Sequence, residues 1–349
     1  MTPPALSLTP LALPLDTGRD PARASAAPRL DTRLRSERAA RKASGALALC
    51  YRGEIHSLLE QRVPPAESGP AALEALAALW HIDMPPRVAR DAAHVFAPQE
   101  DGASPRFGAW EARACPPKAL AALQACARST VRNRLTLIQS RARSTFDLVE
   151  EIAQPLWPDV LAAWCGLAEQ QRRRLHHLGR ALRLALVPGK LSRAGVTSAI
   201  GAIDELHRIF ASAYRQPRDV TRMPSLFAAL ESGWTPALGP IEDVIVIAGM
   251  RILLCGSEGV PGRIGDLVNL LIDRRELAAE WLARPDALAR FVNPGQRSLA
   301  QALAQMQAQA VLEVLLPCFD RIDRAPRGTT WQTRSGLKRL EHLVLRLGA

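Results

Sequence analysis

Aromatic residues are scarce in this sequence: Phe, Trp and Tyr make up 5% of its 349 residues, although hydrophobic residues as a group make up 48%. Alanine and leucine supply most of the apolar residues, and both are strong helix formers. A chain of this length and apolar content can bury the core of one large domain or of two ordinary ones. The composition therefore predicts a mainly α-helical globular protein.

Closely spaced cysteines are also absent. The six thiols are scattered along the chain, at Cys50, Cys115, Cys126, Cys165, Cys255 and Cys318. This spacing excludes a disulfide framework and a cysteine-based zinc site, and it is typical of buried thiols in a reducing cytoplasm. His176 and His177 do not indicate a metal site, because adjacent side chains on a helix point about 100° apart. We predict no metal ion and a cytoplasmic location.

Signals for a membrane or a nucleic acid are missing as well. No apolar run is expected to reach the length needed to span a bilayer, and the first residues lack a basic-then-apolar leader pattern. The formal net charge is +11, but no helix-turn-helix, zinc-finger or aromatic RNA-binding signature accompanies it. We therefore predict neither a membrane nor a nucleic acid as a partner, and interpret the basic excess as a solvated surface.

The usual catalytic loops are not found either. Gly256, Gly259 and Gly262 recur at a regular spacing, but no predicted strand precedes them and no acidic partner accompanies them, as a dinucleotide site requires. The same segment does not match the Gly-x-Ser-x-Gly elbow of α/β-hydrolases, because its glycines are wrongly placed. The sequence thus gives no support to nucleotide-dependent or α/β-hydrolase chemistry.

What the sequence does contain is a long apolar stretch at residues 240–273. Residues 244–255 are apolar on nearly every side, with only Gly249 and Arg251 interrupting them, and such a pattern is typical of a buried helix. Three glycines and a proline follow directly, in the middle of the stretch. Because proline removes a backbone donor and clashes with the preceding turn, we predict a kink or a break near Ser257.

The rest of the chain alternates between helical patterns and breaks. Residues 1–40 are rich in proline, alanine and arginine and are predicted to form a loose tail, whereas residues 41–349 are predicted to form a single helical domain. Besides the central stretch, helical spacing is found at residues 39–61, 70–80, 81–97, 170–186, 197–214, 274–291 and 298–316. Residues 99–105 are predicted to form a polar loop.

Two segments carry a family resemblance. The first contains FDLV at residues 146–149, PLWP at residues 155–158 and CGL at residues 165–167, where glycine is expected to end a helix. The second contains CGSE at residues 255–258, followed by a helical run and a leucine-rich segment. In type and order these motifs resemble those of the cytochrome P-450 family, and the second resembles its long central helix.

The resemblance implies a fold. Residues 321–347 resemble the C-terminal strands of the family, with Ser335 and Gly336 as a turn. The expected architecture is therefore mainly α, a cytochrome P-450-like helical fold that is truncated and carries a small C-terminal β element. Pro155 and Pro158 are expected to bend the chain before the next helix.

The sequence departs from the family wherever haem chemistry is performed. Gly259 and Val260 stand where the family has the threonines that manage oxygen and protons. Residues 107–114 lack the His-x-x-x-Arg pattern that grips the haem propionates. Only a turn at residues 291–298 replaces the long segment that carries the cysteine ligand loop. These three losses together predict a haem-free protein without a cofactor.

The resemblance also implies a function, because a haem-free subset of the family serves as auxiliary proteins of glycosyltransferases in natural-product pathways. The first hypothesis is a non-catalytic pseudoenzyme that docks on a glycosyltransferase or another biosynthetic enzyme and raises its activity. The candidate partner contacts are a basic helix face and two tryptophans, namely Arg172, Arg173, Arg174, Trp110 and Trp234. A solvated helix surface and core tryptophans are the simpler interpretations of these residues.

The second hypothesis is a non-oxidative enzyme. The former haem cavity would hold a small apolar ligand, and Glu258 would act as an acid or a base, since a carboxyl group in an apolar pocket has a raised pKa. No second catalytic group accompanies Glu258 in the sequence. A third interpretation is a truncated relic without function, or a structural subunit.

Overall fold

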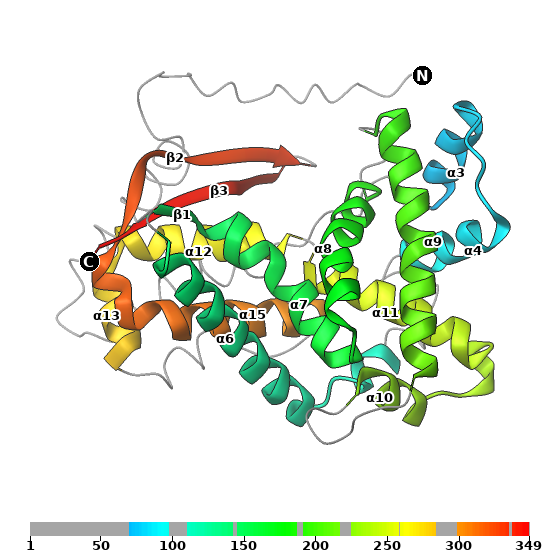
Figure 1. Ribbon diagram of the computed structural model, residues 1–349, viewed down its shortest axis with the longest axis horizontal. Helices are drawn as coiled ribbons and strands as arrows, with labels where there is room; N and C mark the ends of the chain where they lie inside the picture. Colours follow the sequence, from blue (N-terminus) through cyan, green and yellow to red (C-terminus); the bar gives the residue numbers. More distant parts are fainter. Residues whose placement is uncertain are drawn as a thin grey trace, which may run out of the picture. The chain divides into compact units, whose positions relative to one another are not determined.

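The computed structural model describes residues 70–97, 110–141, 145–186, 191–216, 225–257, 259–283, 299–334 and 337–348. The predicted tail at residues 1–40, the predicted helix at residues 39–61 and the predicted loop at residues 99–105 lie outside these ranges. Helices make up most of the described part, and a small sheet accompanies them (Figure 1). The predicted mainly α fold with a small C-terminal β element is confirmed.

Most described helices fall where the sequence predicts them, but the helix Leu226–Ser232 was not predicted, and the predicted helix at residues 274–291 is described only up to residue 283. In chain order they are α3 (Pro70–Leu79), α4 (Pro86–Val95), α6 (Pro117–Gln139), α7 (Gln154–Cys165), α8 (Glu169–Leu184), α9 (Arg193–Arg215), α10 (Leu226–Ser232), α11 (Ile241–Ser257), α12 (Val260–Asp273), α13 (Arg275–Ala283) and α15 (Leu299–Leu315). A π-helical segment, Leu148–Ala153, leads into α7, and a 3-10 segment, Leu316–Arg321, follows α15.

The sheet is built from strands that are distant in the sequence. Strand β1 (Thr145–Asp147) pairs with β3 (Leu337–Leu347), and β3 pairs with β2 (Ile322–Arg334), all antiparallel, in the order β1-β3-β2. The pairing of β2 with β3 continues to Arg334 opposite Leu337, so the predicted turn falls between these two residues. The turn residues themselves lie outside the described ranges.

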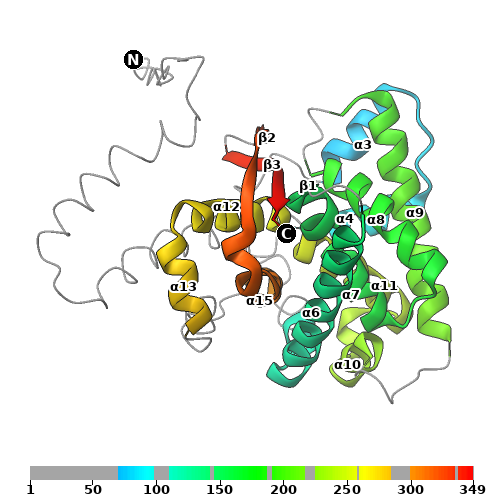
Figure 2. The ribbon, with the colours of Figure 1, turned by 60° about the vertical axis from the view of Figure 1, so that its left-hand side comes forward.

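The core is organised around α11, as its all-round apolar sequence predicts. Val244 to Leu254 are all buried, and α11 packs against α4, α7, α8, α9 and α15. Helix α15 is buried on most of its surface and packs against α6, α11 and α12. Figure 2 shows α6 and α7 side by side in a second view. A helix covered on every side must be apolar on every side.

The central stretch breaks at the predicted place. Helix α11 ends at Ser257 and α12 begins at Val260, and between them Gly259 takes a left-handed conformation with φ of 66°. Glycine adopts this conformation without the steric cost that a side chain would add. Pro261 lies in the first turn of α12, where its missing N–H costs no hydrogen bond.

One detail differs from the expectations, and another agrees with them. Pro155 and Pro158 do not bend the chain ahead of the next helix; they lie inside α7, in its first turns, directly after the π-helical segment. Because α7 continues directly from the π-helical segment, where the N–H of Gln154 donates to the carbonyl oxygen of Val149, the two prolines lie within one continuous helical run, and each removes a backbone donor from it. Gly166, with φ of 69°, ends α7 in the left-handed conformation predicted for it.

Membrane-length helices are also present, contrary to expectation. The stretch Ile241–Asp273, which the break divides into α11 and α12, and the stretch Leu299–Arg321 are long and apolar enough to cross a bilayer by length and composition alone. The prediction that no run reaches this length is therefore wrong. The structure buries 88% and 78% of their most apolar windows, respectively. Packing against neighbouring helices accounts for this apolar character, because a fully covered core helix has the same composition.

Candidate functional site

The end of α11, where the family resemblance places its central chemistry, is closed by side chains from two other helices. Trp157 of α7 lies so close to Gly256 that a Cβ atom there would overlap its indole ring. The indole Nε1 donates to the carbonyl oxygen of Ile252 at 3.0 Å. Gln307 of α15 donates from Nε2 to the carbonyl oxygen of Gly256 at 2.7 Å. Helices α7, α11 and α15 therefore converge at the break.

In the family that the motifs resemble, a cysteine thiolate binds the haem iron, and the thiol environments test whether the described cysteines of this chain fit that role. Burial raises the pKa of Cys126, Cys165 and Cys318, and it raises the pKa of Cys115 to about 12. Cys318 is buried in the 3-10 segment after α15, where its Sγ donates to the carbonyl oxygen of Leu315 at 3.2 Å. All four thiols are therefore protonated at neutral pH.

A haem thiolate needs the opposite environment, one that lowers the pKa of the cysteine and presents it to the iron. Cys255 does not supply it from a loop, because it lies inside α11. Cys50 lies outside the described residues. The cysteines that the structure describes thus do not fit a thiolate-bound haem.

A buried ion pair, which the sequence does not predict, crosses the core beside α11. The guanidinium Nε of Arg251 donates to Oε1 of Glu111 at 2.8 Å, and the two side chains are 6% and 2% exposed. Arg251 also donates from Nη1 to the carbonyl oxygen of His94 at 2.8 Å, at the end of α4. Desolvation by burial raises the pKa of Glu111 from 4.5 to about 7, although the charge and hydrogen bond of Arg251 oppose this rise.

Side chains of the types that bind metal ions come together at one place in the described part of the chain. Asp147, Glu150 and His342 have ligand atoms within 4.8 Å of one another. Asp147 already accepts hydrogen bonds from the backbone N–H groups of Val149 at 2.9 Å and Leu343 at 3.2 Å. Its carboxylate therefore caps the π-helical segment and ties it to β3, and these structural contacts account for its position.

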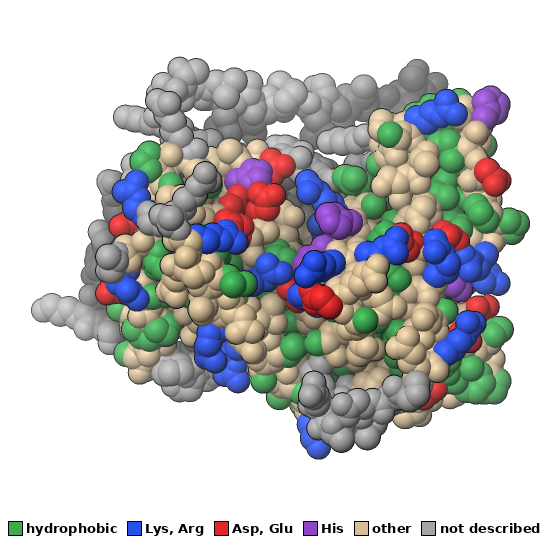
Figure 3. Space-filling model, viewed as in Figure 1, with side chains coloured by type: hydrophobic (Ala, Val, Ile, Leu, Met, Phe, Trp, Pro, Cys, Tyr) green, Lys and Arg blue, Asp and Glu red, His purple; other side chains and the backbone are tan. Residues whose placement is uncertain are grey.

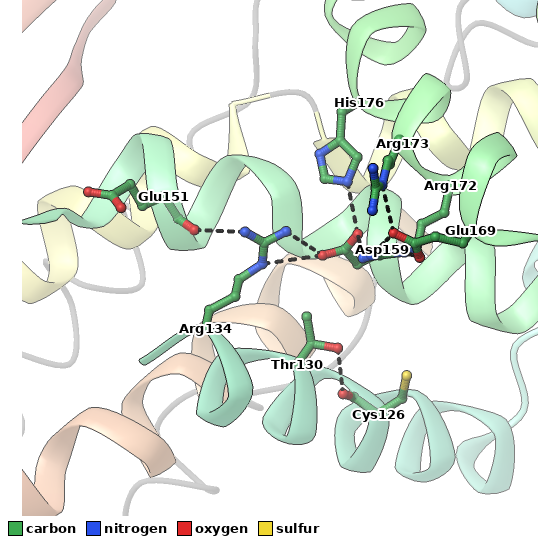
Figure 4. A network of polar contacts seen from close by, with 9 residues as sticks. All are labelled: Cys126, Thr130, Arg134, Glu151, Asp159, Glu169, Arg172, Arg173 and His176. Atoms are coloured by element: carbon green, nitrogen blue, oxygen red, sulfur yellow. Dashed lines mark hydrogen bonds and ion pairs between the residues drawn. The ribbon is translucent and has the colours of Figure 1, made fainter. Parts of the chain in front are cut away.

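The predicted basic face on α8 lies beside a buried carboxylate. Asp159 of α7 is 5% exposed and receives side chains from two other helices (Figure 4). Arg134 of α6 donates from Nη2 to its Oδ2 at 2.5 Å, and from α8 Arg172 donates from Nη1 to its Oδ1 at 2.6 Å. His176 of α8 lies 2.8 Å from the same Oδ1. Burial alone would raise the pKa of Asp159, but hydrogen bonds and charges from His176 and Arg134 lower it below the usual value.

The three candidate arginines differ in their exposure and in their partners within this network. Arg172 is held between Asp159 and Glu169 and joins α7 to α8, so its main contacts lie within the protein. The side chains of Arg173 and Arg174 are 77% and 55% exposed, and they pair with Glu169 and Glu205. Figure 3 shows basic, acidic and histidine side chains beside one another over the region where Figure 1 places α7 and α8. The face is therefore an alternation of charges rather than a purely basic patch.

The two candidate tryptophans have different positions. Trp110 is 1% exposed and donates from Nε1 to the carbonyl oxygen of Leu230 at 2.9 Å. It belongs to the core, so the hypothesis of an exposed anchor at Trp110 is wrong, and the simpler interpretation of a core tryptophan holds there. Trp234 is half-buried and donates to the carbonyl oxygen of Gly239 at 3.1 Å. Only Trp234 presents part of its ring to solvent.

The alternative hypothesis rests on Glu258, which lies outside the described residues. Its role as an acid or a base beside a small apolar ligand stays a prediction.

Comparisons with known proteins show which solved structures share this architecture. No protein-family model matches the sequence, and no curated protein matches it significantly. Solved structures do match. CalO2 superposes with a TM-score of 0.62 at 16% identity, over 84% of this chain and 89% of that one. P450BioI, in complex with hexadec-9Z-enoic acid ligated acyl carrier protein, superposes with a TM-score of 0.59 at 15% identity, over 75% and 83% of the two chains.

A third match comes from a biosynthetic pathway. The LnmA cytochrome P450 hydroxylase, from the leinamycin pathway of Streptomyces atroolivaceus S-140, superposes with a TM-score of 0.57 at 16% identity, over 72% of this chain and 81% of that one. At such identities the likeness establishes the fold alone. The fold is cytochrome P450-like, as the motifs at residues 146–167 and 255–258 predict.

Proposed function

We propose that this chain, with its cytochrome P450-like fold, performs no haem chemistry and acts as a non-catalytic auxiliary partner of a biosynthetic enzyme such as a glycosyltransferase. The observation on which the proposal rests is the raised pKa of four buried cysteine thiols. Burial raises the pKa of Cys115, Cys126, Cys165 and Cys318, so none of these is poised to bind iron as a thiolate. A helical scaffold without a competent ligand can still offer a docking surface.

The structural neighbours make protein docking a reasonable role for this scaffold. P450BioI was crystallised in complex with an acyl carrier protein, and LnmA belongs to a natural-product pathway. For this chain we propose the exposed side of α8, with Arg173 and Arg174, and the half-buried Trp234 as contacts to the partner. A half-exposed tryptophan suits the centre of an interface, whereas exposed arginines paired on their own surface suit its rim.

The haem-free part of the proposal has a direct spectroscopic test. Purified protein titrated with haemin and then reduced under carbon monoxide is expected to lack the absorption of a thiolate-bound carbonyl complex, because the described thiols hold their protons. Myoglobin and a thiolate-ligated P450 serve as reference spectra. A stoichiometric thiolate-type spectrum, lost in a single cysteine-to-serine variant, would contradict the proposal and would identify the ligand.

The docking part is tested by co-expression with a glycosyltransferase encoded beside this protein. The wild-type chain is expected to raise the yield and turnover of the transferase. The double variant Arg173→Gln/Arg174→Gln is expected to slow association roughly fivefold at low ionic strength, since each rim charge pair contributes about 0.5 kcal/mol. Stopped-flow association measured at two salt concentrations detects this change.

The matched control for docking is Arg128→Gln/Arg141→Gln. It removes the same charge from exposed arginines that pair with Glu313 and Glu151 on other helices. Equal slowing by both double variants would mean that net charge, rather than the α8 surface, governs association. If the solubility and turnover of the transferase do not change when this chain is present, the proposed auxiliary function is wrong.

A further inference from the structure

A polar pocket lies between α4 and α9, in a part of the molecule that the proposed function does not use. Its volume is about 420 Å³, which is within the range of small-molecule sites. The lining residues are Arg87 of α4, and His207, Arg208, Ala211, Ser212, Arg215 and Gln216 of α9 or its end. Among the described residues, three guanidinium groups and no carboxylate line the pocket.

The inner wall of the pocket is a buried histidine–aspartate pair. Nδ1 of His207 lies 2.7 Å from Oδ2 of Asp91, and Asp91 on α4 is completely buried. The His207 side chain is 9% exposed, and it lines the pocket. An imidazole that donates from Nδ1 to a carboxylate is fixed in orientation, and its Nε2 is then directed away from that partner.

Nε2 of His207 has no hydrogen-bond partner among the described residues, in which only the Nδ1 contact is found. The buried Oδ1 of Asp91 likewise has no hydrogen-bond partner there, although Nε of Arg90 lies 3.7 Å from it. Buried polar groups in folded proteins are normally satisfied by protein, water or ligand. Nε2 of His207 is not itself fully buried, so it is available to hydrogen-bond to water or to a ligand in the pocket.

The arginines are held in place by carboxylates that stand outside the lining. Arg87 and Arg208 share Asp204, which each of them contacts, and Arg215 pairs with Glu242. A single carboxylate serves two guanidinium groups, so each of these retains donors that are not used by Asp204. The pairs position the cations while the cavity surface stays basic.

We propose that the α4–α9 pocket binds a small molecule bearing a phosphate or diphosphate group. Guanidinium forks match the oxygens of a phosphoryl group, and several arginines around one pocket supply more donors than a carboxylate can use. Ser212 and Gln216 add a hydroxyl and an amide at the same surface. His207 completes the site from inside, where Asp91 orients its imidazole through Nδ1 and leaves Nε2 for a hydrogen bond to the phosphoryl group.

The test is isothermal titration calorimetry of the full chain with inorganic pyrophosphate, and with sodium acetate at matched ionic strength. The wild-type protein is expected to bind one pyrophosphate saturably and to show no binding of acetate. Arg208→Gln and Arg215→Gln remove pocket cations whose side chains are 63% and 67% exposed, so these variants are expected to fold normally. Each is expected to weaken binding about tenfold, the loss typical of one charge-assisted hydrogen bond.

The control is Arg128→Gln, which removes an exposed, carboxylate-paired arginine from α6. Its affinity for pyrophosphate is expected to equal that of the wild type. His207→Gln replaces the inner imidazole and is expected to weaken binding at least as much as Arg208→Gln. An equal loss in Arg128→Gln, an equal response to acetate, or an unsaturable titration would each overturn the proposal. None of these outcomes depends on a partner enzyme, so failure here leaves the auxiliary function standing.

Discussion

At pH 8, where Glu111 with its pKa of about 7 is ionised, replacing Arg251 by methionine is expected to lower the free energy of unfolding by about 3–5 kcal/mol, the usual cost of removing one partner from a buried ion pair. Methionine keeps the apolar stem but leaves the Glu111 carboxyl without its donor in a position that is 2% exposed. It also withdraws the hydrogen bond to the carbonyl oxygen of His94, which ties the end of α4 to α11. Urea unfolding followed by circular dichroism measures the change.

The control for this prediction is the double variant Arg251→Met/Glu111→Leu. Because both charged groups are then replaced by apolar ones, the double variant is expected to recover most of the stability that Arg251→Met loses. A double variant as unstable as the sum of both single variants would show that the two side chains do not interact in the folded protein.

The same pair gives stability a dependence on pH. Burial raises the pKa of Glu111 from 4.5 to about 7, so between these values the folded state retains a proton that the unfolded state releases. The free energy of unfolding is therefore expected to fall as the pH rises from 4.5 to 7, by about 3 kcal/mol from this group. Because glutamine does not ionise, the free energy of unfolding of Glu111→Gln is expected not to show this decrease between pH 4.5 and 7. Parallel pH profiles for wild type and Glu111→Gln would contradict the assignment.

This pair also shows where sequence reasoning stops. The apolar character of residues 244–255 was enough to predict a buried helix, and Arg251 was noted as an interruption. Its partner could not be predicted, because Glu111 is 140 residues away along the chain and lies in a segment without hydrophobic periodicity. A buried arginine indicates that an acidic side chain must lie beside it, but which acid this is depends on tertiary packing.

Features with a local cause were predicted well. The break after Ser257 and the helix end at Gly166 follow from glycine and proline in the segment itself, and both are confirmed. Features set by distant contacts were not. The basic face of α8 was visible in the sequence, but Asp159 comes from α7, and the burial of Trp110 depends on α10. The site between α4 and α9 has the same origin, since Asp91 and His207 lie 116 residues apart.

Replacing Gly256 by alanine is expected to lower the free energy of unfolding by about 3 kcal/mol, the upper part of the range for overpacking a core. The added Cβ would overlap the five-membered part of the Trp157 indole, and the ring cannot withdraw without losing its hydrogen bond to the carbonyl oxygen of Ile252. Thermal and urea unfolding measure the loss.

Gly201→Ala is the matched control, because Gly201 lies inside α9 and an added Cβ there would meet no atom within 4 Å. This variant is expected to raise the free energy of unfolding by up to about 1 kcal/mol, through the higher helix propensity of alanine. Opposite signs at two helical glycines separate the steric effect from propensity. Equal stabilisation at both positions would mean that Trp157 does not occupy the space beside Gly256.

A second substitution locates the clash. Trp157→Phe removes the indole atoms that approach position 256, so the double variant Gly256→Ala/Trp157→Phe is expected to be at least about 1 kcal/mol more stable than the sum of the single effects predicts. Coupling of this sign requires that α7 and α11 meet at the break in the central helix. If the two single effects simply add, Trp157 does not lie beside Gly256. The closed junction of α7, α11 and α15, which leaves no room at this point, would then not exist.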